Sequence, residues 1–169
     1  MDLIYILKAV VLGIVEGLTE FLPVSSTGHL IIVSELIDFP QDAFSNMFNI
    51  VIQLAAILAV LILFWPRIWV KLKSFFNGEQ EGRNFMLIWV IGCVPAALAG
   101  VLLSDFIDAH LFSVPTVAIA LIVGAIALLL TERIFAPKAV TKQIEQVSWK
   151  QALGVGLFQC LYLWPGFSR

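Results

Sequence analysis

The densest chemistry of this chain lies in residues 16–29, EGLTEFLPVSSTGH, between two apolar stretches. Glu16 and Glu20 are four residues apart, so a helix would place both carboxylates on one face, about 5–6 Å apart at their Cβ atoms. Two carboxylates this close in an apolar surrounding share a proton, bind a divalent cation or face a cationic side chain. A water-facing pair on an amphipathic hairpin is the simpler alternative, but carboxylates inside a membrane are expected to be functional.

The turn that follows supplies the groups that an anion prefers. Ser25, Ser26 and Thr27 carry hydroxyl donors. Gly28 lets a backbone approach closely, and the N–H groups at the start of a second helix carry partial positive charge. Helix capping alone would need one hydroxyl rather than three. A lone histidine is usually a packed or interfacial residue, but His29 lies three residues from Ser26, which makes it a candidate general base or nucleophile.

The bulk composition places these polar residues in a membrane protein. Hydrophobic residues make up 60% of the 169 residues and charged residues 13%, whereas soluble domains are about half apolar and a quarter charged. The mean hydropathy is +0.98. Three uncharged runs match the roughly 20-residue helix that crosses a bilayer: 46–66, 85–103 and 111–130. A net charge of −2 without a basic block gives no reason to expect nucleic acid as a partner.

The charges between these runs predict an orientation. Residues 67–84 and 131–150 each contain Lys and Arg in excess over Asp and Glu, whereas 35–45 and 104–110 contain acidic residues and no Lys or Arg. Because short basic loops stay on the cytoplasmic side, we expect the first two segments inside and the last two outside. This assignment alternates without contradiction across the three spans.

The polar segment interrupts the apolar start of the chain. A single helix over about residues 3–34 would carry both glutamates and Pro23 across the bilayer centre, at roughly 2.5–3.5 kcal/mol for each carboxylate. Pro23 disfavours helix in the residue before it, so a first helix should end near Leu22. A second helix, capped by the hydroxyls of the turn, should cover about 28–37. The two arms predict a re-entrant hairpin that opens to the outside.

The end of the chain, KQALGVGLFQCLYLWPGFSR, repeats this design. At an offset of 142 residues, Lys8 corresponds to Lys150, Pro23 to Pro165 and Ser26 to Ser168. Because three spans separate the two segments, the second enters from the opposite side, as in the inverted repeats that build many membrane substrate sites. We therefore predict a first repeat over 1–148, with its hairpin at 3–37, and the first arm of a truncated second hairpin over 149–169.

The expected fold is an all-α integral membrane protein with a re-entrant helical hairpin, three transmembrane helices and the start of a second, inverted repeat. Arg169, near the bottom of the second hairpin, would be the cationic partner of the site. Its guanidinium can hold a phosphate through two parallel hydrogen bonds. A solvated terminal arginine is the alternative if the chain ends there.

These residues match a family. The motif EGLTEFLPVSSTGH together with LWPGFSR resembles the undecaprenyl-diphosphate phosphatases, also called bacitracin-resistance proteins. The resemblance covers the whole chain, but family members are longer and their second motif continues past the arginine. It implies the N-terminal part of a bacterial inner-membrane enzyme, inactive by itself. The complete enzyme would hydrolyse undecaprenyl diphosphate to undecaprenyl phosphate and inorganic phosphate, which recycles the lipid carrier of cell-wall synthesis.

The resemblance also implies residue roles. Glu16 and Glu20 would be the acidic catalytic pair and would hold a divalent cation, Mg²⁺ or Ca²⁺, on the outer face. Ser26 and His29 would be the reacting or orienting groups, and Arg169 would bind the diphosphate. Either Ser26 attacks phosphorus while His29 takes its proton, or His29 activates water. The alternative functions are an inverted-repeat transporter or lipid flippase without hydrolysis, and a non-catalytic scaffold. We also consider a homodimer as the oligomeric state.

Overall fold

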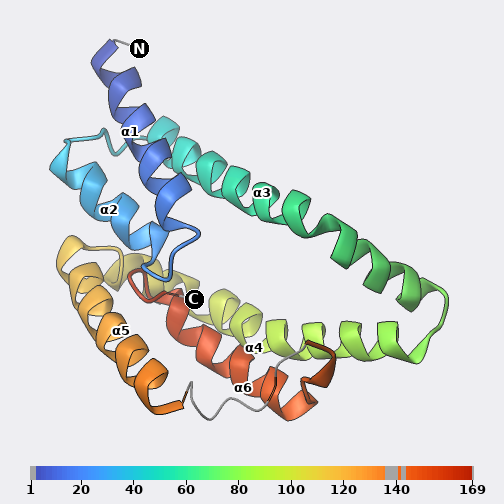
Figure 1. Cartoon of the computed structure of the whole chain (residues 1–169). Helices are drawn as coiled ribbons and strands as arrows, with labels where there is room; N and C mark the ends of the chain where they lie inside the picture. The colour runs from blue at the N-terminus through green and yellow to red at the C-terminus, as the bar shows by residue number, and fades with distance from the viewer. Residues whose placement is uncertain (1–2, 136–140, 142–143, 169) are drawn as a thin grey trace.

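The computed structural model of the chain describes residues 3–135, 141 and 144–168 (Figure 1). All regular elements in these residues are helices, which confirms the predicted all-α class for the part of the chain described. In chain order they are α1 Leu3–Thr19, α2 Ser26–Leu36, α3 Ala43–Phe76, α4 Gln80–His110, α5 Val114–Phe135, the 3-10 helix η2 Ile144–Gln146, α6 Trp149–Gln159 and the 3-10 helix η3 Cys160–Leu163.

Three of these helices are long and apolar enough to cross a membrane. They are α3, α4 and α5. The predicted spans 46–66 and 85–103 lie within α3 and α4, whereas α5 begins three residues after the start of the predicted span 111–130. Few side chains in their most apolar stretches are buried inside the protein. A helix that is apolar all round and covered by little protein suits contact with lipid. The prediction of three membrane-crossing segments is therefore confirmed in length and composition.

α3 extends well beyond its predicted span. The sequence predicts that this span ends at Pro66 and that residues 67–84 connect it to the next span. In the structure α3 continues through Pro66 to Phe76, and only residues 77–79 separate it from α4. An internal proline removes one backbone hydrogen bond, which bends a helix more readily than it ends one when the flanking turns are otherwise stabilised.

Those flanking turns are stabilised because the ends of α3 and α4 pack into a tight helical hairpin. A Cβ atom on Gly82 would lie 2.1 Å from the backbone nitrogen of Phe75, so the two backbones approach as only glycine allows. Lys71 and Glu81 form an ion pair across the same contact. These contacts lie outside the apolar runs, so hydropathy does not predict them. At its other end α4 continues to His110, through a segment that was predicted to be a connection.

α1 and α2 form the predicted helical hairpin at the start of the chain. α1 ends at Thr19, slightly before the predicted end near Leu22. α2 begins at Ser26, with Ser25 as its N-cap, so the expectation that a hydroxyl of the turn caps this helix is confirmed. The helix starts two residues earlier than predicted because the first hydroxyl of the turn is the one that caps it.

A small apolar core holds the two arms of this hairpin together. Leu12 of α1, Leu30 of α2 and Phe39 beyond α2 are almost completely buried. The Lys8 ammonium donates a hydrogen bond of 2.8 Å to the Asp38 carbonyl oxygen, which joins the early part of α1 to the chain just after α2. The polar turn between the arms is therefore anchored on both sides.

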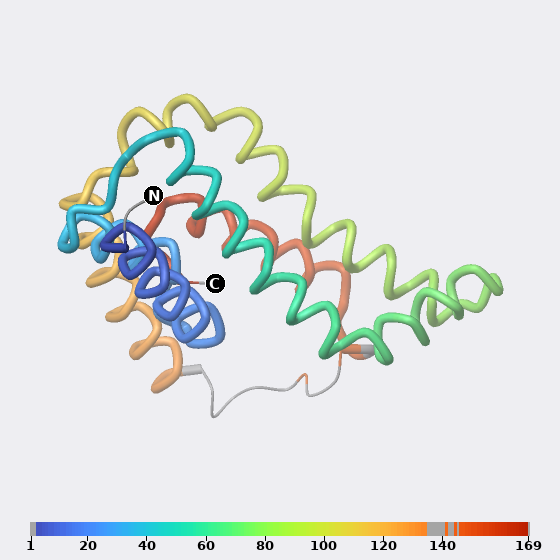
Figure 2. The backbone as a smooth tube through the Cα atoms, turned by 90° about the horizontal axis from the view of Figure 1, so that it is seen from above, coloured from blue at the N-terminus to red at the C-terminus, as the bar shows by residue number. Residues whose placement is uncertain are grey.

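α6 lies along α4 and carries the end of the described chain back to the α1–α2 turn, as Figure 1 and Figure 2 both show. A Cβ atom on Gly156 of α6 would lie 2.5 Å from the backbone oxygen of Gly92 in α4, so these two helices cross at backbone contact. A capping box formed by Ser148 and Gln151 fixes where α6 begins. This crossing directs residues 164–168 towards the hairpin turn.

Candidate active site between two turns

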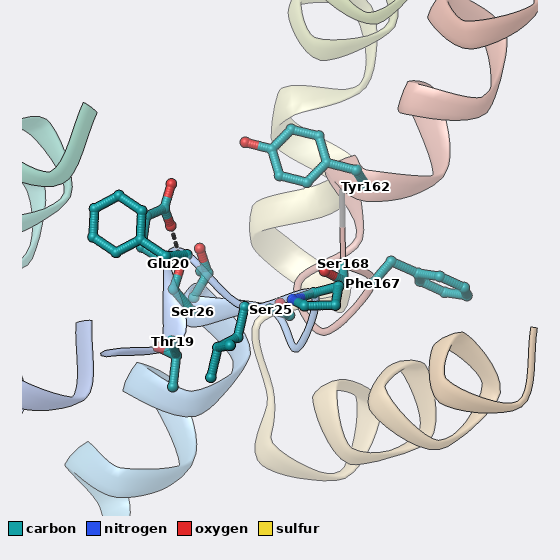
Figure 3. A pocket seen from close by; sticks show the side chains of 11 residues that line it. Thr19, Glu20, Ser25, Ser26, Tyr162, Phe167 and Ser168 are labelled. Atoms are coloured by element: carbon teal, nitrogen blue, oxygen red, sulfur yellow. Dashed lines mark hydrogen bonds between the residues drawn. The ribbon is translucent and has the colours of Figure 1, made fainter. Parts of the chain in front are cut away.

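A pocket of about 250 Å³ lies where the turn after α1 meets the segment around and after η3 (Figure 3). Its lining residues come from two parts of the sequence that are more than 130 residues apart. They are Thr19, Glu20, Phe21, Leu22, Pro23, Ser25, Ser26, Thr27, Tyr162, Phe167 and Ser168. The pocket thus combines the polar motif of the first hairpin with the end of the described chain.

Ser26 and Glu20 form a direct hydrogen bond in this pocket. The Ser26 hydroxyl donates to Glu20 Oε2 at 2.5 Å, as Figure 3 shows. Ser26 is the buried first residue of α2, and Glu20 continues the last turn of α1 by donating its backbone N–H to the Glu16 carbonyl oxygen at 2.9 Å. A carboxylate that accepts a hydroxyl proton can act as the general base for that oxygen.

Ser25 connects the two halves of the pocket. Its φ of +61° lies in the left-handed region, which turns its side chain back over the start of α2. The hydroxyl oxygen accepts hydrogen bonds from the backbone N–H of Gly28 at 3.3 Å and from that of Gly166 at 3.2 Å. A serine hydroxyl has two acceptor positions and one proton, so its O–H remains to donate.

Two glycines permit this contact. Gly166 has a φ of +109°, and a Cβ atom on it would lie 2.6 Å from the carbonyl oxygen of Val117, which is fully buried in α5. A Cβ atom on Gly28 would lie 3.1 Å from the Gly166 Cα. The sequence predicts that an anion approaches the backbone of Gly28. In the structure it is the backbone of Gly166, in the second turn, that lies close to Gly28. Gly28 is packed beneath the pocket and is not part of its lining.

Glu16 and His29 lie outside the lining of the pocket. Glu16 is only 1% exposed and lies on the buried side of α1, one helical turn before Glu20. His29 is half-buried, and its Nδ1 donates a hydrogen bond of 2.9 Å to the Ser25 carbonyl oxygen. In a neutral imidazole with this hydrogen bond, the other ring nitrogen, Nε2, is the proton acceptor. The hydrogen bond that the structure gives to the Ser26 hydroxyl goes to Glu20.

Arg169 lies outside the described residues, although Ser168, the residue before it, lines the pocket. Among the residues that the structure describes, no group of three or more His, Cys, Asp or Glu side chains is arranged to hold a metal ion. The carboxylate of Glu20 and the hydroxyls beside it are the hard oxygen donors that Mg²⁺ and Ca²⁺ prefer. The donor chemistry therefore fits such a cation, with one carboxylate in the lining.

The motifs gave no role to Tyr162 or Phe167, which complete the wall on the side of the second turn. One signal in the sequence points to Tyr162. The offset of 142 residues that pairs Pro23 with Pro165 also pairs Glu20 with Tyr162. The same offset pairs Ser25 with Phe167, which lies within the motif LWPGFSR. The places of Tyr162 and Phe167 in the second segment were therefore open to prediction from the repeat.

Comparison with known proteins identifies the same family that the motifs resemble. The family model described as bacitracin resistance protein BacA matches residues 9–169. The undecaprenyl-diphosphatase of Clostridium tetani is 47% identical over 167 residues, which are 99% of this chain and 61% of the relative. The undecaprenyl-diphosphatases of Bacillus subtilis and Geobacillus thermodenitrificans are 47% and 49% identical, and each alignment covers 100% of this chain and 64% of the relative. The chain thus spans less than two thirds of the length of these curated relatives.

Proposed function

The chain belongs to the bacitracin resistance protein BacA family, and from this membership we propose that it acts as a membrane phosphatase on undecaprenyl diphosphate. The products would be undecaprenyl phosphate and inorganic phosphate. The observation that carries the proposal is the hydrogen bond from Ser26 to Glu20, inside a pocket built from two turns that also present the hydroxyls of Ser25 and Thr27. A hydroxyl paired with a carboxylate, beside further hydroxyl donors, suits attack on a phosphorus atom.

In the proposed reaction, Ser26 Oγ attacks the terminal phosphorus while its proton passes to Glu20 Oε2. The bond between that phosphorus and the bridging oxygen breaks, and undecaprenyl phosphate leaves with the electron pair. Water then attacks the phosphoserine, the Ser26 oxygen takes a proton back from Glu20, and inorganic phosphate is released. Direct activation of water by His29 is the alternative route, and it predicts that Ser26 is dispensable.

We propose Mg²⁺ or Ca²⁺ as the divalent cation, with Glu20 and Glu16 as the residues that hold it. When bound, the cation would supply positive charge for the diphosphate oxygens. Arg169 follows Ser168 of the pocket lining in the sequence, so we propose its guanidinium for the same head group. Of the pocket hydroxyls, that of Ser25 is fixed from two sides by backbone N–H groups, so its proton is held ready for an anionic oxygen.

We also propose that α1 and α2 form a re-entrant hairpin, and that α6 with η3 enters the membrane from the opposite side as the first arm of an inverted repeat. The meeting of the two turns at one pocket supports this arrangement, because inverted repeats with broken helices bring their turns together near the midplane. The site would open to the outer face of a bacterial inner membrane. The homodimer stays a prediction.

The orientation can be tested with cysteines in a background that lacks Cys93 and Cys160. Asp105→Cys, in the exposed last part of α4, should react with an impermeant thiol reagent added to intact cells. Asn77→Cys, in the exposed turn between α3 and α4, should react only after the membrane is opened, because the neighbouring segment is basic. The opposite labelling pattern would put the hairpin on the cytoplasmic side.

Hydrolysis can be separated from transport in one preparation of liposomes. Because the relatives are longer, we define the extended protein as this chain continued by the part of the Bacillus subtilis relative that it does not match. With undecaprenyl diphosphate labelled at the terminal phosphate, the extended protein should release labelled inorganic phosphate and leave undecaprenyl phosphate. Movement of intact diphosphate lipid between leaflets without release of phosphate would instead identify a flippase.

A further inference from the structure

Tyr162 lines the pocket from the side opposite Glu20 and Ser26. It lies in η3, the 3-10 helix that follows α6, and its side chain is half-buried. Figure 3 shows the ring above the pocket, with the hydroxyl directed towards the side on which Glu20 lies. The residue lies outside the motifs EGLTEFLPVSSTGH and LWPGFSR, and only the internal repeat indicates its position.

The position of Tyr162 corresponds to that of Glu20 in the first segment. Glu20 precedes Pro23 by three residues, and Tyr162 precedes Pro165 by three residues. Both lie at the end of a first arm, and both face the same pocket. The first segment therefore contributes a carboxylate acceptor to the pocket, and the second contributes a phenol donor at the matching place.

A phosphate group in this pocket needs donors beyond those of the first turn. Glu20 is an acceptor, and the Ser26 proton is already donated to it. The described lining contains no Lys, Arg or His side chain. A phenol is a neutral donor on a rigid ring with two side-chain torsions, so it can present an O–H to an anion with little loss of conformational freedom.

We propose that Tyr162 is a substrate-contacting residue whose phenolic O–H donates a hydrogen bond to a non-bridging oxygen of the terminal phosphate. The phosphate would lie between this phenol and the Ser26–Glu20 pair, so that Ser26 Oγ faces phosphorus. The inference rests on the proposed function, and it assigns Tyr162 to binding and positioning without a covalent step.

The hydroxyl can be removed while the ring is kept. Tyr162→Phe in the extended protein should lower kcat/KM for undecaprenyl diphosphate roughly tenfold or more, the range for a lost hydrogen bond to a charged group. Tyr5→Phe is the matched control, because the Tyr5 hydroxyl bonds the Ser45 hydroxyl at 3.1 Å, away from the pocket lining. This control should keep kcat/KM, and Tyr162→Phe should keep the unfolding temperature.

A spectroscopic measurement reads the contact directly. The chain has two tyrosines, and with ¹³C at the tyrosine ζ carbon their signals in the extended protein are assigned by their loss in Tyr5→Phe and Tyr162→Phe. Inorganic pyrophosphate, at concentrations that inhibit phosphate release, should shift the Tyr162 signal and leave the Tyr5 signal in place. An unmoved Tyr162 signal, or unchanged kinetics of Tyr162→Phe in an active protein, overturns the inference and leaves the proposed function standing.

Failure of the proposed function has a different outcome. In that case the unmodified extended protein releases no phosphate from undecaprenyl diphosphate at all, whatever the tyrosine signals do. The proposed contact between Tyr162 and phosphate is then tested by the pyrophosphate titration alone. A shift confined to the Tyr162 signal at saturating pyrophosphate supports the contact, and an unmoved Tyr162 signal overturns it.

Discussion

Glu16→Gln and Glu20→Gln should each reduce phosphate release by the extended protein by roughly 10²–10⁴-fold. Glutamine keeps the size of the side chain but can neither take the Ser26 proton nor offer a carboxylate to a cation. Glu20 accepts the Ser26 hydrogen bond, and Glu16 is buried one helical turn earlier on the same arm. Because the two carboxylates are proposed to act as a unit, the double variant should be little worse than either single variant.

The same variants test the proposed cation. A chelator should abolish release by the unmodified protein, and added Mg²⁺ should restore it, whereas neither glutamine variant should recover with Mg²⁺. Glu35→Gln is the matched control, because Glu35 is an exposed glutamate on α2 outside the pocket lining. Unfolding temperatures separate loss of chemistry from loss of fold. Near-normal turnover by either single variant, with unchanged affinity for the metal, would remove the pair from the site.

The membrane-crossing helices could be predicted because the property that places them is local. An uncharged run of sufficient length is apolar whatever packs beside it. Two of the runs lie within α3 and α4, and α5 covers all but the first three residues of the third. The ends of the helices could not be predicted in the same way. The last turns of α3 depend on its contact with Gly82 of α4 and on the Lys71–Glu81 ion pair, which are tertiary interactions beyond the apolar run.

The first hairpin was predictable for a similar reason. Pro23 disfavours helix before it and Ser25 caps the helix after it, so both arms end within a few residues of their predicted bounds. Both are local signals that one stretch of sequence contains. The left-handed conformation of Ser25 was not predicted, and it is this conformation that brings the serine hydroxyl to both Gly28 and Gly166.

The motif predicted Glu20 and Ser26, which line the pocket, but it did not predict that they pair with each other. The motif contains Glu20, Ser26 and His29, and its spacing suggested that His29 would serve Ser26. In the structure Ser26 donates to Glu20, whereas His29 donates to the Ser25 carbonyl oxygen. The difference arises because α2 begins at Ser26, which directs the first side chain of the helix back towards the end of α1. The pocket wall formed by Tyr162, Phe167 and Ser168 depends on the packing of α6 against α4. Such tertiary packing cannot be predicted from a local sequence pattern.

In the proposed reaction Ser26 is the attacking group, and a comparison of two buried serines of α2 tests this role. Ser26 and Ser34 are both buried serines of α2, at 8% and 3% exposure. The Ser34 hydroxyl has no hydrogen-bond partner among the described residues and lies outside the pocket lining, so Ser34→Ala controls for the loss of a buried hydroxyl.

The measurement is the initial rate of phosphate release from undecaprenyl diphosphate by the extended protein and by both alanine variants, at equal protein and Mg²⁺ concentrations. Ser26→Ala should lower the rate by about 10³-fold or more, since a nucleophile and its base act as one unit. Ser34→Ala should retain the unmodified rate. Release by Ser26→Ala at a rate close to that of Ser34→Ala would contradict the account, because phosphorus would then be attacked by water without the serine.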